Sequence, residues 1–390
     1  MKTQHFSRRS FLQQSMAWAA GVPLASLCAR ARLLAAAADL SPGARPSPKV
    51  AIVPCHSYGP EVRPALEKCF DLLGGVGWLV KNKTVTVKLN LTGSDFRRIL
   101  GRPVGETYMS HPASVMALTA ALLGAGARRV RIVESTQRRA RLEFTLTGAG
   151  WDVPALEALG NVEFENTRNL GSSSTYARLP VPGGGYMFSS FDLNRAYVDT
   201  DVLVSMAKLK NHLSAGVTLT MKNLFGLPPN SLYSNAMGNE NATGARFVLH
   251  DPTGMDQYKL PALKPGITST DPTWRVPRVT ADVCAARPIH LGIIDGITAM
   301  SGGEGPWGGL EKLKFTTPGV LIAGFNPVST DAVGVAVMGY ENPRAARGTK
   351  PFHFCDNHLL LAEQAGLGTA DLAQIDLRGT PIAKVRYPYA

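Results

Sequence analysis

The chain has 390 residues, with 41 lysines and arginines against 29 aspartates and glutamates, and a formal net charge of +12 at pH 7. Five of the basic residues lie in the first 38 positions, which contain no acidic residue, so removal of that segment lowers the charge to +7. This excess suits an anionic small substrate or an acidic cell-envelope surface. Nucleic acid is not expected as a partner, because the chain has no basic stripe interleaved with aromatic residues and no nucleic-acid motif.

Residues 1–38 have the pattern of a twin-arginine signal peptide, with the paired arginines in Ser7-Arg8-Arg9-Ser10-Phe11-Leu12. The apolar run that follows, residues 16–29, is shorter than the roughly 20 residues of a stable membrane span. Small residues before Asp39 offer a cleavage position. We therefore expect the twin-arginine translocation machinery to export the folded chain to the periplasm or the exterior, with no span in the mature form. A lipid-surface anchor helix and an uncleaved tail are the alternatives.

Four cysteines remain after the signal, at positions 55, 69, 284 and 355, and no two of them form a C-x-x-C pair. An iron–sulfur cluster within this chain and a zinc ribbon are therefore not expected, because both require closely spaced thiolates. One or two disulfides could form outside the cytoplasm. Because folding precedes this kind of export, the fold should not depend on them.

Apolar runs alternate with helical stretches along the rest of the chain. Strands are predicted over 49–53, 84–89, 130–133, 201–205, 291–294 and 320–323, and helices over 60–73 and 112–123. This alternation predicts a mostly parallel α/β sheet flanked by helices, and the lack of polar alternation in several strands is typical of a sheet covered on both faces. We expect residues 39–390 to form a single large α/β domain.

Two regions interrupt this pattern. Residues 166–198 are rich in glycine, serine and proline and could form an antiparallel excursion. Residues 226–280 form a long irregular insertion, which favours a cover over a site or a binding loop, with disorder as the alternative. Between them, residues 213–219 have the pattern of a helix start, with Ser214 as a candidate cap.

Polar residues recur directly after the predicted strands. Lys88 lies at the end of the strand 84–89 and Asn90 follows it, and Glu134, Lys208 and Asp295 follow the strands 130–133, 201–205 and 291–294. Ligands bind at the carboxyl edge of the strands in open parallel sheets, so these segments could assemble one composite site. The alternative is that polar residues simply mark strand ends.

The densest block spans residues 208–223, where three lysines, two asparagines and a histidine occur without an acidic residue. Such donors suit a phosphate or a carboxylate, and a solvated basic helix is the alternative. The expected substrate-binding residues are Lys88, Asn90, Lys208, Asn211, Lys222 and Asn223. His212 is the first choice for proton transfer because its ordinary pKa lies near neutrality, and Lys210 could serve instead if burial lowers its pKa.

Three acidic residues could complete the site. Asp295, Glu304 and Asp331 offer oxygen ligands of the kind that Mg²⁺, Mn²⁺ and Ca²⁺ prefer, so a divalent metal is possible. For Asp331 the simpler role is pairing with the dipole in the first turn of its own helix. The segment that contains His353 and His358 could be a metal-ligand cluster, since His353 and Asp356 or Asn357 would share a helical face, although packing is the favoured interpretation. The G-x-S-x-G and H-E-x-x-H motifs of two hydrolase classes are absent.

Taken in order, these motifs resemble the family named domain of unknown function 362. The resemblance covers roughly residues 49–340 and rests on Val87–Asn90, His111-Pro112, Val133-Glu134, Lys208–His212, Met221–Gly226, Ile294–Gly296, Glu304–Pro306 and Ser329–Ala332. The family has no general assigned activity. Some members are joined to ferredoxin-like iron–sulfur modules, from which this chain departs by lacking clustered cysteines, and exported members with a twin-arginine leader look similar.

Three functional hypotheses follow. The first is an exported enzyme that acts on an anionic small substrate, with or without a metal. The second is a non-catalytic protein of the cell envelope that binds an anion or a metal. The third is a redox partner associated with an iron–sulfur system. The sequence leaves the substrate, the reaction and the oligomeric state open.

Overall fold

The computed structural model describes residues 47–93, 96–254, 259–307 and 310–389. The predicted signal peptide therefore lies outside the described residues. No helix in the described part of the chain is long and apolar enough to cross a lipid bilayer. The four cysteines at positions 55, 69, 284 and 355 are buried and free, so no disulfide joins any two of them.

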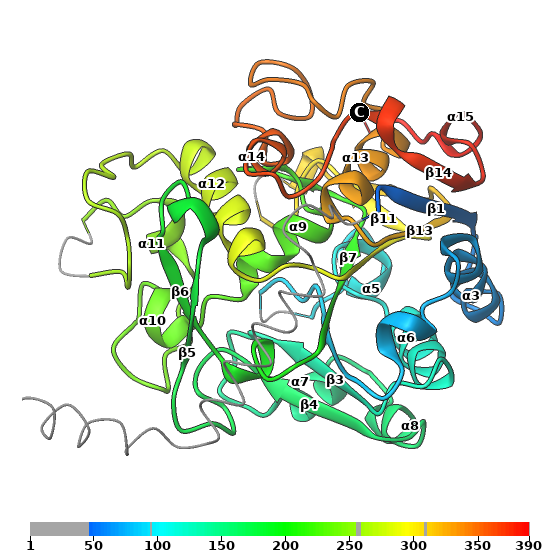
Figure 1. Ribbon diagram of the computed structural model, residues 1–390, viewed down its shortest axis with the longest axis horizontal. Coiled ribbons are helices and arrows are strands. Elements are labelled where there is room, and N and C mark those ends of the chain that lie inside the picture. Colours follow the sequence, from blue (N-terminus) through cyan, green and yellow to red (C-terminus); the bar gives the residue numbers. More distant parts are fainter. Residues whose placement is uncertain (1–46, 94–95, 255–258, 308–309, 390) are drawn as a thin grey trace, which may run out of the picture. The chain divides into compact units, whose positions relative to one another are not determined.

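The framework is an eight-stranded sheet in the order β14-β1-β13-β10-β7-β2-β3-β4 (Figure 1). Only β13 runs antiparallel to its neighbours, β1 and β10, and the other pairs are parallel. The mostly parallel sheet is thus confirmed. Its strands are β1 (Lys49–Pro54), β2 (Thr84–Lys88), β3 (Arg129–Glu134), β4 (Val162–Asn166), β7 (Val202–Lys208), β10 (Leu291–Gly296), β13 (Val320–Gly324) and β14 (Asp376–Gly379).

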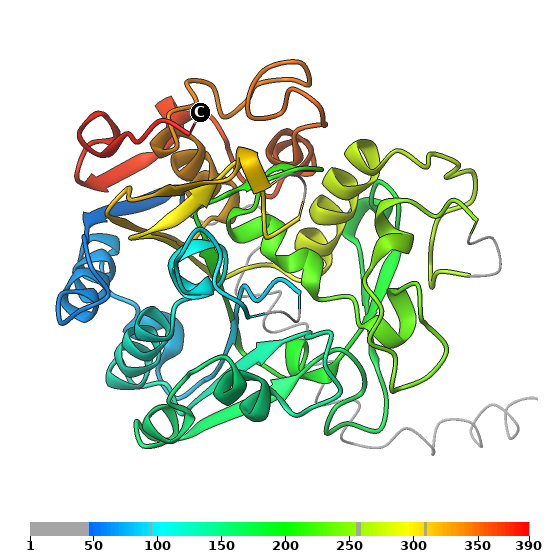
Figure 2. The same cartoon turned by 180° about the vertical axis from the view of Figure 1, so that it is seen from behind.

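Helices cover both faces of this sheet (Figures 1 and 2). Alternate residues of one strand enter two separate cores, as the two-residue period of a strand requires: Val204 and Met206 of β7 belong to one, and Leu203 to the other. The first core contains α3 (Val62–Leu73) and α6 (Pro112–Gly124). The second contains α9 (Leu219–Asn223), α12 (Pro272–Ala286), α13 (Pro327–Val337) and α14 (His358–Gln364).

Shorter elements fill the connections. The helical ones are α4 (Gly77–Val80), α5 (Val104–Thr107), α7 (Leu142–Gly148), α8 (Val153–Glu157), α10 (Asn230–Tyr233), α11 (Phe247–His250) and α15 (Ile382–Val385), with 3-10 turns at Pro182–Gly184, Arg195–Tyr197, Leu224–Gly226, Leu310–Lys312 and Leu372–Gln374. Three small antiparallel pairs complete the list: β5 (Ala177–Pro180) with β6 (Ser190–Leu193), β8 (Asn211–His212) with β9 (Gly216–Val217), and β11 (Ala299–Ser301) with β12 (Lys314–Thr316).

The strand order reverses between β2 and β7. From β2 the chain builds β3 and β4 on one side, and it then returns to place β7 and β10 on the other side. Since β2, β3, β7 and β10 are parallel, their carboxyl ends meet at one edge of the sheet. Ligands of open α/β sheets bind at such a reversal, so a ligand site is expected at this edge.

Most sequence-based element predictions are confirmed, including the six strands, the two long helices and the antiparallel pair within 166–198. The helix expected over 213–219 is wrong. A two-residue hairpin, β8 with β9, occupies that segment, and α9 begins only at Leu219, whose φ is +46°. Ser214 caps no helix there. The segment 226–280 is also less irregular than expected, because it contains α10, α11 and the start of α12.

Candidate anion-binding site

Four lysines lie around the carboxyl ends of β2, β7 and β10. In the sheet register Lys88 lies opposite Ser205, and Lys208 lies opposite Asp295. Lys210 follows β7 directly, and Lys222 lies on α9, which packs against β7. All four side chains are more than nine-tenths buried. Because burial of an ammonium group is unfavourable unless it is compensated, the partners of each lysine indicate its role.

Lys88 is fully paired. Its ammonium nitrogen lies 2.6 Å from Oε1 of Glu134, which ends β3. Glu134 also accepts hydrogen bonds from the backbone N–H groups of Leu91 (2.7 Å) and Ser135 (2.8 Å). Gly226 gives the pair room, since a Cβ there would lie 3.1 Å from the lysine nitrogen. Burial lowers the pKa of Lys88, and the attraction of Glu134 opposes that shift.

Lys208 is paired in the same way on the opposite face of the sheet. Its ammonium nitrogen lies 3.3 Å from Oδ2 of Asp295 and donates to the Tyr58 hydroxyl (2.5 Å) and the Gly105 carbonyl oxygen (2.6 Å). Asp295 in turn accepts hydrogen bonds from the hydroxyls of Tyr58 and Ser114, each at 2.9 Å. This network compensates the lysine internally, and burial again lowers the pKa of Lys208.

Lys210 has acceptors but no carboxylate partner within ion-pair distance in the described residues. Its ammonium nitrogen donates to the carbonyl oxygens of Tyr108 (2.6 Å) and Glu304 (2.8 Å) and to the Thr92 hydroxyl (3.3 Å). These three acceptors match the three protons of an ammonium group. Burial lowers the pKa of Lys210 to about 7, against the attraction of the Glu304 carboxylate. The three hydrogen bonds therefore fix the position of Lys210, but no carboxylate in the described residues forms an ion pair with it.

Lys222 is the exception among the four. Lys222 is 7% exposed. Its ammonium nitrogen makes no hydrogen bond or ion pair within the described ranges. The nitrogen lies 4.2 Å from the centre of the Phe225 ring. Burial lowers its pKa to about 7, Glu304 opposes the shift, and the nearby charges of Arg246 and Lys88 add to it. The Lys222 side chain is thus largely buried, whereas its ammonium nitrogen is not fully enclosed and has no hydrogen-bond or ion-pair partner in the described ranges.

His212 lies beside this lysine and is held as a neutral ring. Its Nδ1 accepts the Ser214 backbone N–H at 3.1 Å, which assigns the ring proton to Nε2. Burial and the charge of Lys222 lower the pKa of His212 well below its ordinary range. The ring can therefore donate a hydrogen bond through Nε2 and is poorly suited to take up a proton. Asn211, next to it, donates to the Tyr340 hydroxyl at 2.9 Å and anchors β8.

The other two predicted asparagines form a buried pair. Asn90 donates to Oδ1 of Asn223 at 3.1 Å, and Asn223 donates to the Ser205 hydroxyl at 3.0 Å and to the Lys88 carbonyl oxygen at 3.3 Å. These bonds tie α9 to the ends of β2 and β7. The Oδ1 atom of Asn90 is buried without a hydrogen-bond partner in the described residues. Asn90 therefore has an acceptor available, whereas Asn223 is fully engaged.

The three acidic residues proposed as metal ligands are not brought together. Asp295 belongs to the Lys208 network. Glu304 accepts the Leu213 backbone N–H at 2.9 Å and the Trp307 indole N–H at 3.1 Å. Across the described ranges, no group of three or more histidine, cysteine, aspartate or glutamate residues could hold a metal ion.

Asp331 has a structural role other than the one expected for it. Asp331 lies in α13, and the N-terminus of that helix is capped by Asn326. The Asp331 carboxylate instead accepts hydrogen bonds from the first turn of another helix, α9. The donors are the Thr220 N–H (2.8 Å), the Thr220 hydroxyl (2.5 Å) and the Met221 N–H (2.8 Å). Burial raises its pKa to about 7, against these three donors. Asp331 thus fixes the helix that carries Lys222.

The structure adds residues that the sequence did not single out. Tyr58 joins the Lys208 network from the loop after β1, and Tyr389, at the far end of the chain, donates to the Leu209 carbonyl oxygen at 2.8 Å. Arg246, from the segment that appeared irregular, donates to the Gly226 carbonyl oxygen at 3.0 Å and contacts the Ser135 hydroxyl. None of the three lies directly at the end of a predicted strand, so no local pattern pointed to them. His358, interpreted as a packing residue, is fully buried, and His353 and Asp356 precede α14 rather than share a helical face.

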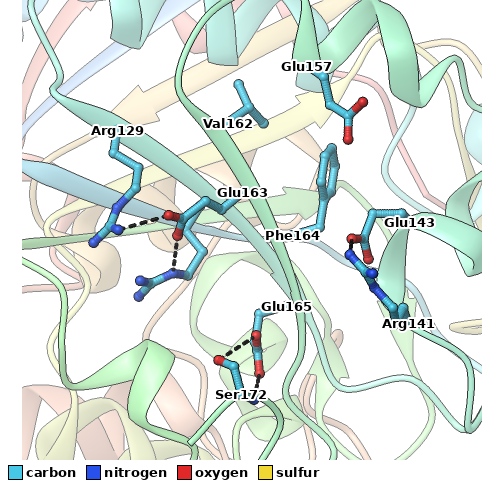
Figure 3. Close-up of a pocket in the computed structure, with 10 residues that line it drawn as sticks. Arg129, Arg141, Glu143, Glu157, Val162, Glu163, Phe164, Glu165 and Ser172 are labelled. Atoms are coloured by element: carbon cyan, nitrogen blue, oxygen red, sulfur yellow. Dashed lines mark hydrogen bonds and ion pairs between the residues drawn. The ribbon is translucent and has the colours of Figure 1, made fainter.

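A hollow of about 500 Å³ lies elsewhere, beside the edge strand β4 (Figure 3). Each arginine that lines it has a carboxylate partner: Glu163 accepts from Arg129 (2.8 Å) and Arg131 (3.2 Å), and Arg141 pairs with Glu143. These ion pairs are solvent-exposed, and charges on an edge strand ordinarily discourage pairing with other chains. We therefore place the candidate site at the lysines and not at this hollow.

The fold and site together define an open α/β protein with a lysine-rich, buried site at the carboxyl edge of its sheet. The sequence model described as "Domain of unknown function (DUF362)" matches residues 85–336. This match spans well over half of the chain, and the protein belongs to that family. The four lysines, the three asparagines and Asp295, Glu304 and Asp331 all fall within the matched segment, whereas Tyr58 and Tyr389 lie outside it.

Other comparisons add little. A crystal structure of a Thermotoga maritima protein is similar at 14% sequence identity, with a TM-score of 0.34, over 68% of this chain and 55% of that chain. This chain thus spans about half the length of that protein. The structural similarity is too low to support a conclusion about the fold or the function of this chain. No protein with a curated description matches the chain.

Proposed function

We propose that this protein is an enzyme that binds an anionic small molecule at Lys222 and Lys210. The observation that supports this most strongly is Lys222, a residue that is only 7% exposed, whose ammonium nitrogen is not fully enclosed and has no hydrogen-bond or ion-pair partner in the described chain. A phosphate or carboxylate placed there would supply the missing acceptor and offset the burial of charge. The Nε2 proton of His212 and the fixed charge of Lys210 would add to the attraction.

Proton transfer is assigned to Lys222 rather than to His212. A general acid or base works best when its pKa lies near the operating pH, and burial brings the pKa of Lys222 to about 7. His212 remains neutral and donates from Nε2, so it would position the substrate. Lys210 has all three protons engaged, which suits a fixed electrostatic role. In this proposal Asp295, Glu304 and Asp331 hold the lysines and the loops, and none of them acts as a metal ligand.

Anion binding can be tested by calorimetric titration of the protein with phosphate, sulfate and citrate. We expect binding of at least one probe, and Lys222→Met should weaken it at least about tenfold while the protein stays folded. Lys68→Met, an exposed lysine on α3, is the matched control and should bind like the native protein. Failure of all three anions to bind, or equal binding by Lys222→Met, would contradict the proposal. Binding without turnover of any organic anion would instead favour the non-catalytic binding protein.

We also infer that the chain is exported after folding, because Arg8 and Arg9 lie in the pattern of a twin-arginine signal, which directs folded proteins across the membrane. Replacement of Arg8 and Arg9 by lysine should leave the protein in the cytoplasm, where it can be found by fractionation. Replacement of Arg30 and Arg32 by lysine is the control and should not block export. Unchanged export of the first variant would contradict twin-arginine transport.

A further inference from the structure

Two large apolar side chains flank the candidate site and are left exposed. Leu213 is 45% exposed and Trp307 is 41% exposed. Both are tied to the same carboxylate, since Glu304 accepts the Leu213 backbone N–H at 2.9 Å and the Trp307 indole N–H at 3.1 Å. An indole held by its N–H presents its apolar surface in a fixed position, so the two side chains form a defined apolar rim.

The residue that holds this rim also contacts the cations. The main-chain oxygen of Glu304 accepts a hydrogen bond from Lys210 at 2.8 Å, and its carboxylate attracts the ammonium group of Lys222. The Trp307 ring stands edge-on to Tyr108, with 6.3 Å between ring centres, and the Tyr108 carbonyl oxygen accepts from Lys210 at 2.6 Å. The apolar rim and the buried positive charge are therefore parts of one structure.

The position of the indole is built into the backbone around it. A Cβ at Gly305 would lie 2.8 Å from the Trp307 ring, and one at Gly93, whose φ is +81°, would lie 3.1 Å from it. A side chain at either position would displace the ring. An exposed tryptophan that two glycines accommodate is better explained by contact with a ligand than by packing within the chain, because much of its surface faces solvent.

We propose that the substrate is an amphipathic organic anion, whose charged group binds Lys222 and whose apolar, preferably planar, group packs against Trp307 and Leu213. This inference rests on the proposed function and specifies its substrate class. A purely inorganic anion would use the lysines and leave the rim in water. An aryl phosphate or aryl carboxylate would satisfy both parts of the site, and burial of the ring would contribute to affinity in proportion to the apolar area removed from water.

Matched pairs of probes test this inference. Calorimetry would compare phenyl phosphate with inorganic phosphate, and benzoate with acetate, on the full chain. We expect the aryl member of the pair that binds to be at least about tenfold tighter. Trp307→Ala should reduce this advantage to about twofold and leave the affinity for the simple anion unchanged, and Leu213→Ala should reduce it partly. Trp78→Ala removes a more exposed tryptophan on α4 (65%) and should have no effect.

The outcomes separate the two proposals. If no probe binds, the anion site itself is wrong. If the simple anions bind but the aryl anions bind no more tightly, the anion site stands and the amphipathic substrate is wrong. Loss of affinity for the simple anion in Trp307→Ala would show that the indole only supports the Glu304 loop, which would also overturn the inference.

Discussion

Two regions of this protein concentrate charged side chains, and they differ in how those charges are compensated. Beside β4, Arg129 and Arg131 share Glu163 at 2.8 and 3.2 Å in a solvent-exposed hollow (Figure 3). At the carboxyl edge of the sheet, four lysines are buried, and Lys210 and Lys222 have no carboxylate within ion-pair distance in the described chain. The first region forms a hollow of about 500 Å³, whereas the second contains the lysines that lack a carboxylate partner.

This difference shows that neither an opening nor a high density of charge is sufficient to mark a ligand site. Exposed ion pairs are screened by water and gain little from a ligand. A buried ammonium without a partner destabilises the free protein and gains strongly from an anion. The following variants test that contrast, from the largest expected effect to the smallest.

The largest effect is expected for Glu134→Gln. It removes the carboxylate that lies 2.6 Å from the buried Lys88 ammonium and leaves that charge unpaired. Stability should fall by about 3–5 kcal/mol in urea unfolding, as for other broken buried pairs. The double variant Lys88→Met/Glu134→Gln removes both charges and should recover at least half of the loss. A loss below about 1 kcal/mol in the single variant would show that the pair is not a buried one.

Lys222→Met should raise the free energy of unfolding, whereas Glu134→Gln lowers it. The folded-state pKa of Lys222, about 7, lies below its ordinary value of 10.5, so the unfolded chain binds this proton more readily than the folded chain does. The charge therefore lowers stability at pH 6, and the penalty disappears as the pH rises from about 7 towards 10.5. We expect the variant to be more stable at pH 6 by about 1–3 kcal/mol in urea unfolding, with no gain near pH 10. Destabilisation at pH 6 would indicate an unseen partner for Lys222.

Anion affinity should follow the same protonation. Sulfate keeps its charge across this range, so a loss of binding reports on the protein. Its affinity should decrease by at least about tenfold for each pH unit above 7, because binding then requires uptake of a proton by Lys222 and by Lys210, whose pKa is also about 7. Titration calorimetry between pH 6 and pH 9 measures this slope. The Lys222→Met variant should bind more weakly and show a smaller slope, which Lys210 alone then causes, and an equal slope in that variant would exclude Lys222 as a titrating group.

A smaller effect is expected at Tyr389. Its hydroxyl donates to the Leu209 carbonyl oxygen at 2.8 Å, between Lys208 and Lys210. Tyr389→Phe should lower stability by about 1 kcal/mol, the net worth of one hydrogen bond. It should weaken sulfate binding about two- to threefold if the bond positions Lys210. Tyr387→Phe is the control, since its hydroxyl makes no described hydrogen bond, and an equal effect in both variants would remove the specific role of Tyr389.

The smallest effect is expected in the hollow beside β4. Glu163→Gln removes the acceptor of Arg129 and Arg131, but all three groups are in contact with solvent. Stability should change by about 0.2–1 kcal/mol, and sulfate affinity should not change. A loss as large as that of Glu134→Gln would show that exposed and buried pairs do not differ here. A loss of sulfate binding would move the candidate site to this hollow.

The sequence predicted the strand framework well because apolar runs bounded by polar residues are a local property. The six predicted strands became β1, β2, β3, β7, β10 and β13. The parallel direction then placed Lys88, Lys208 and Asp295 at one edge, as the position of polar residues after strands had suggested. Predictions failed where a distant group controls the local conformation. Residues 213–219 form no helix, because α9 begins only at Leu219, where the carboxylate of Asp331 receives the first N–H groups.

The composition of the site was thus determined by the sequence alone: three lysines, two asparagines and a histidine within 16 residues, with a fourth lysine and three acids elsewhere. The tertiary structure decided which of these charges are compensated. Glu134 and Asp295 neutralise Lys88 and Lys208, whereas Lys222 is left unpaired. Pairing depends on distances of a few ångströms between segments far apart in the chain. Such distances exist only once the sheet has formed, and they separate the lysines that are paired within the fold from Lys222, which has no ion-pair partner in the described chain.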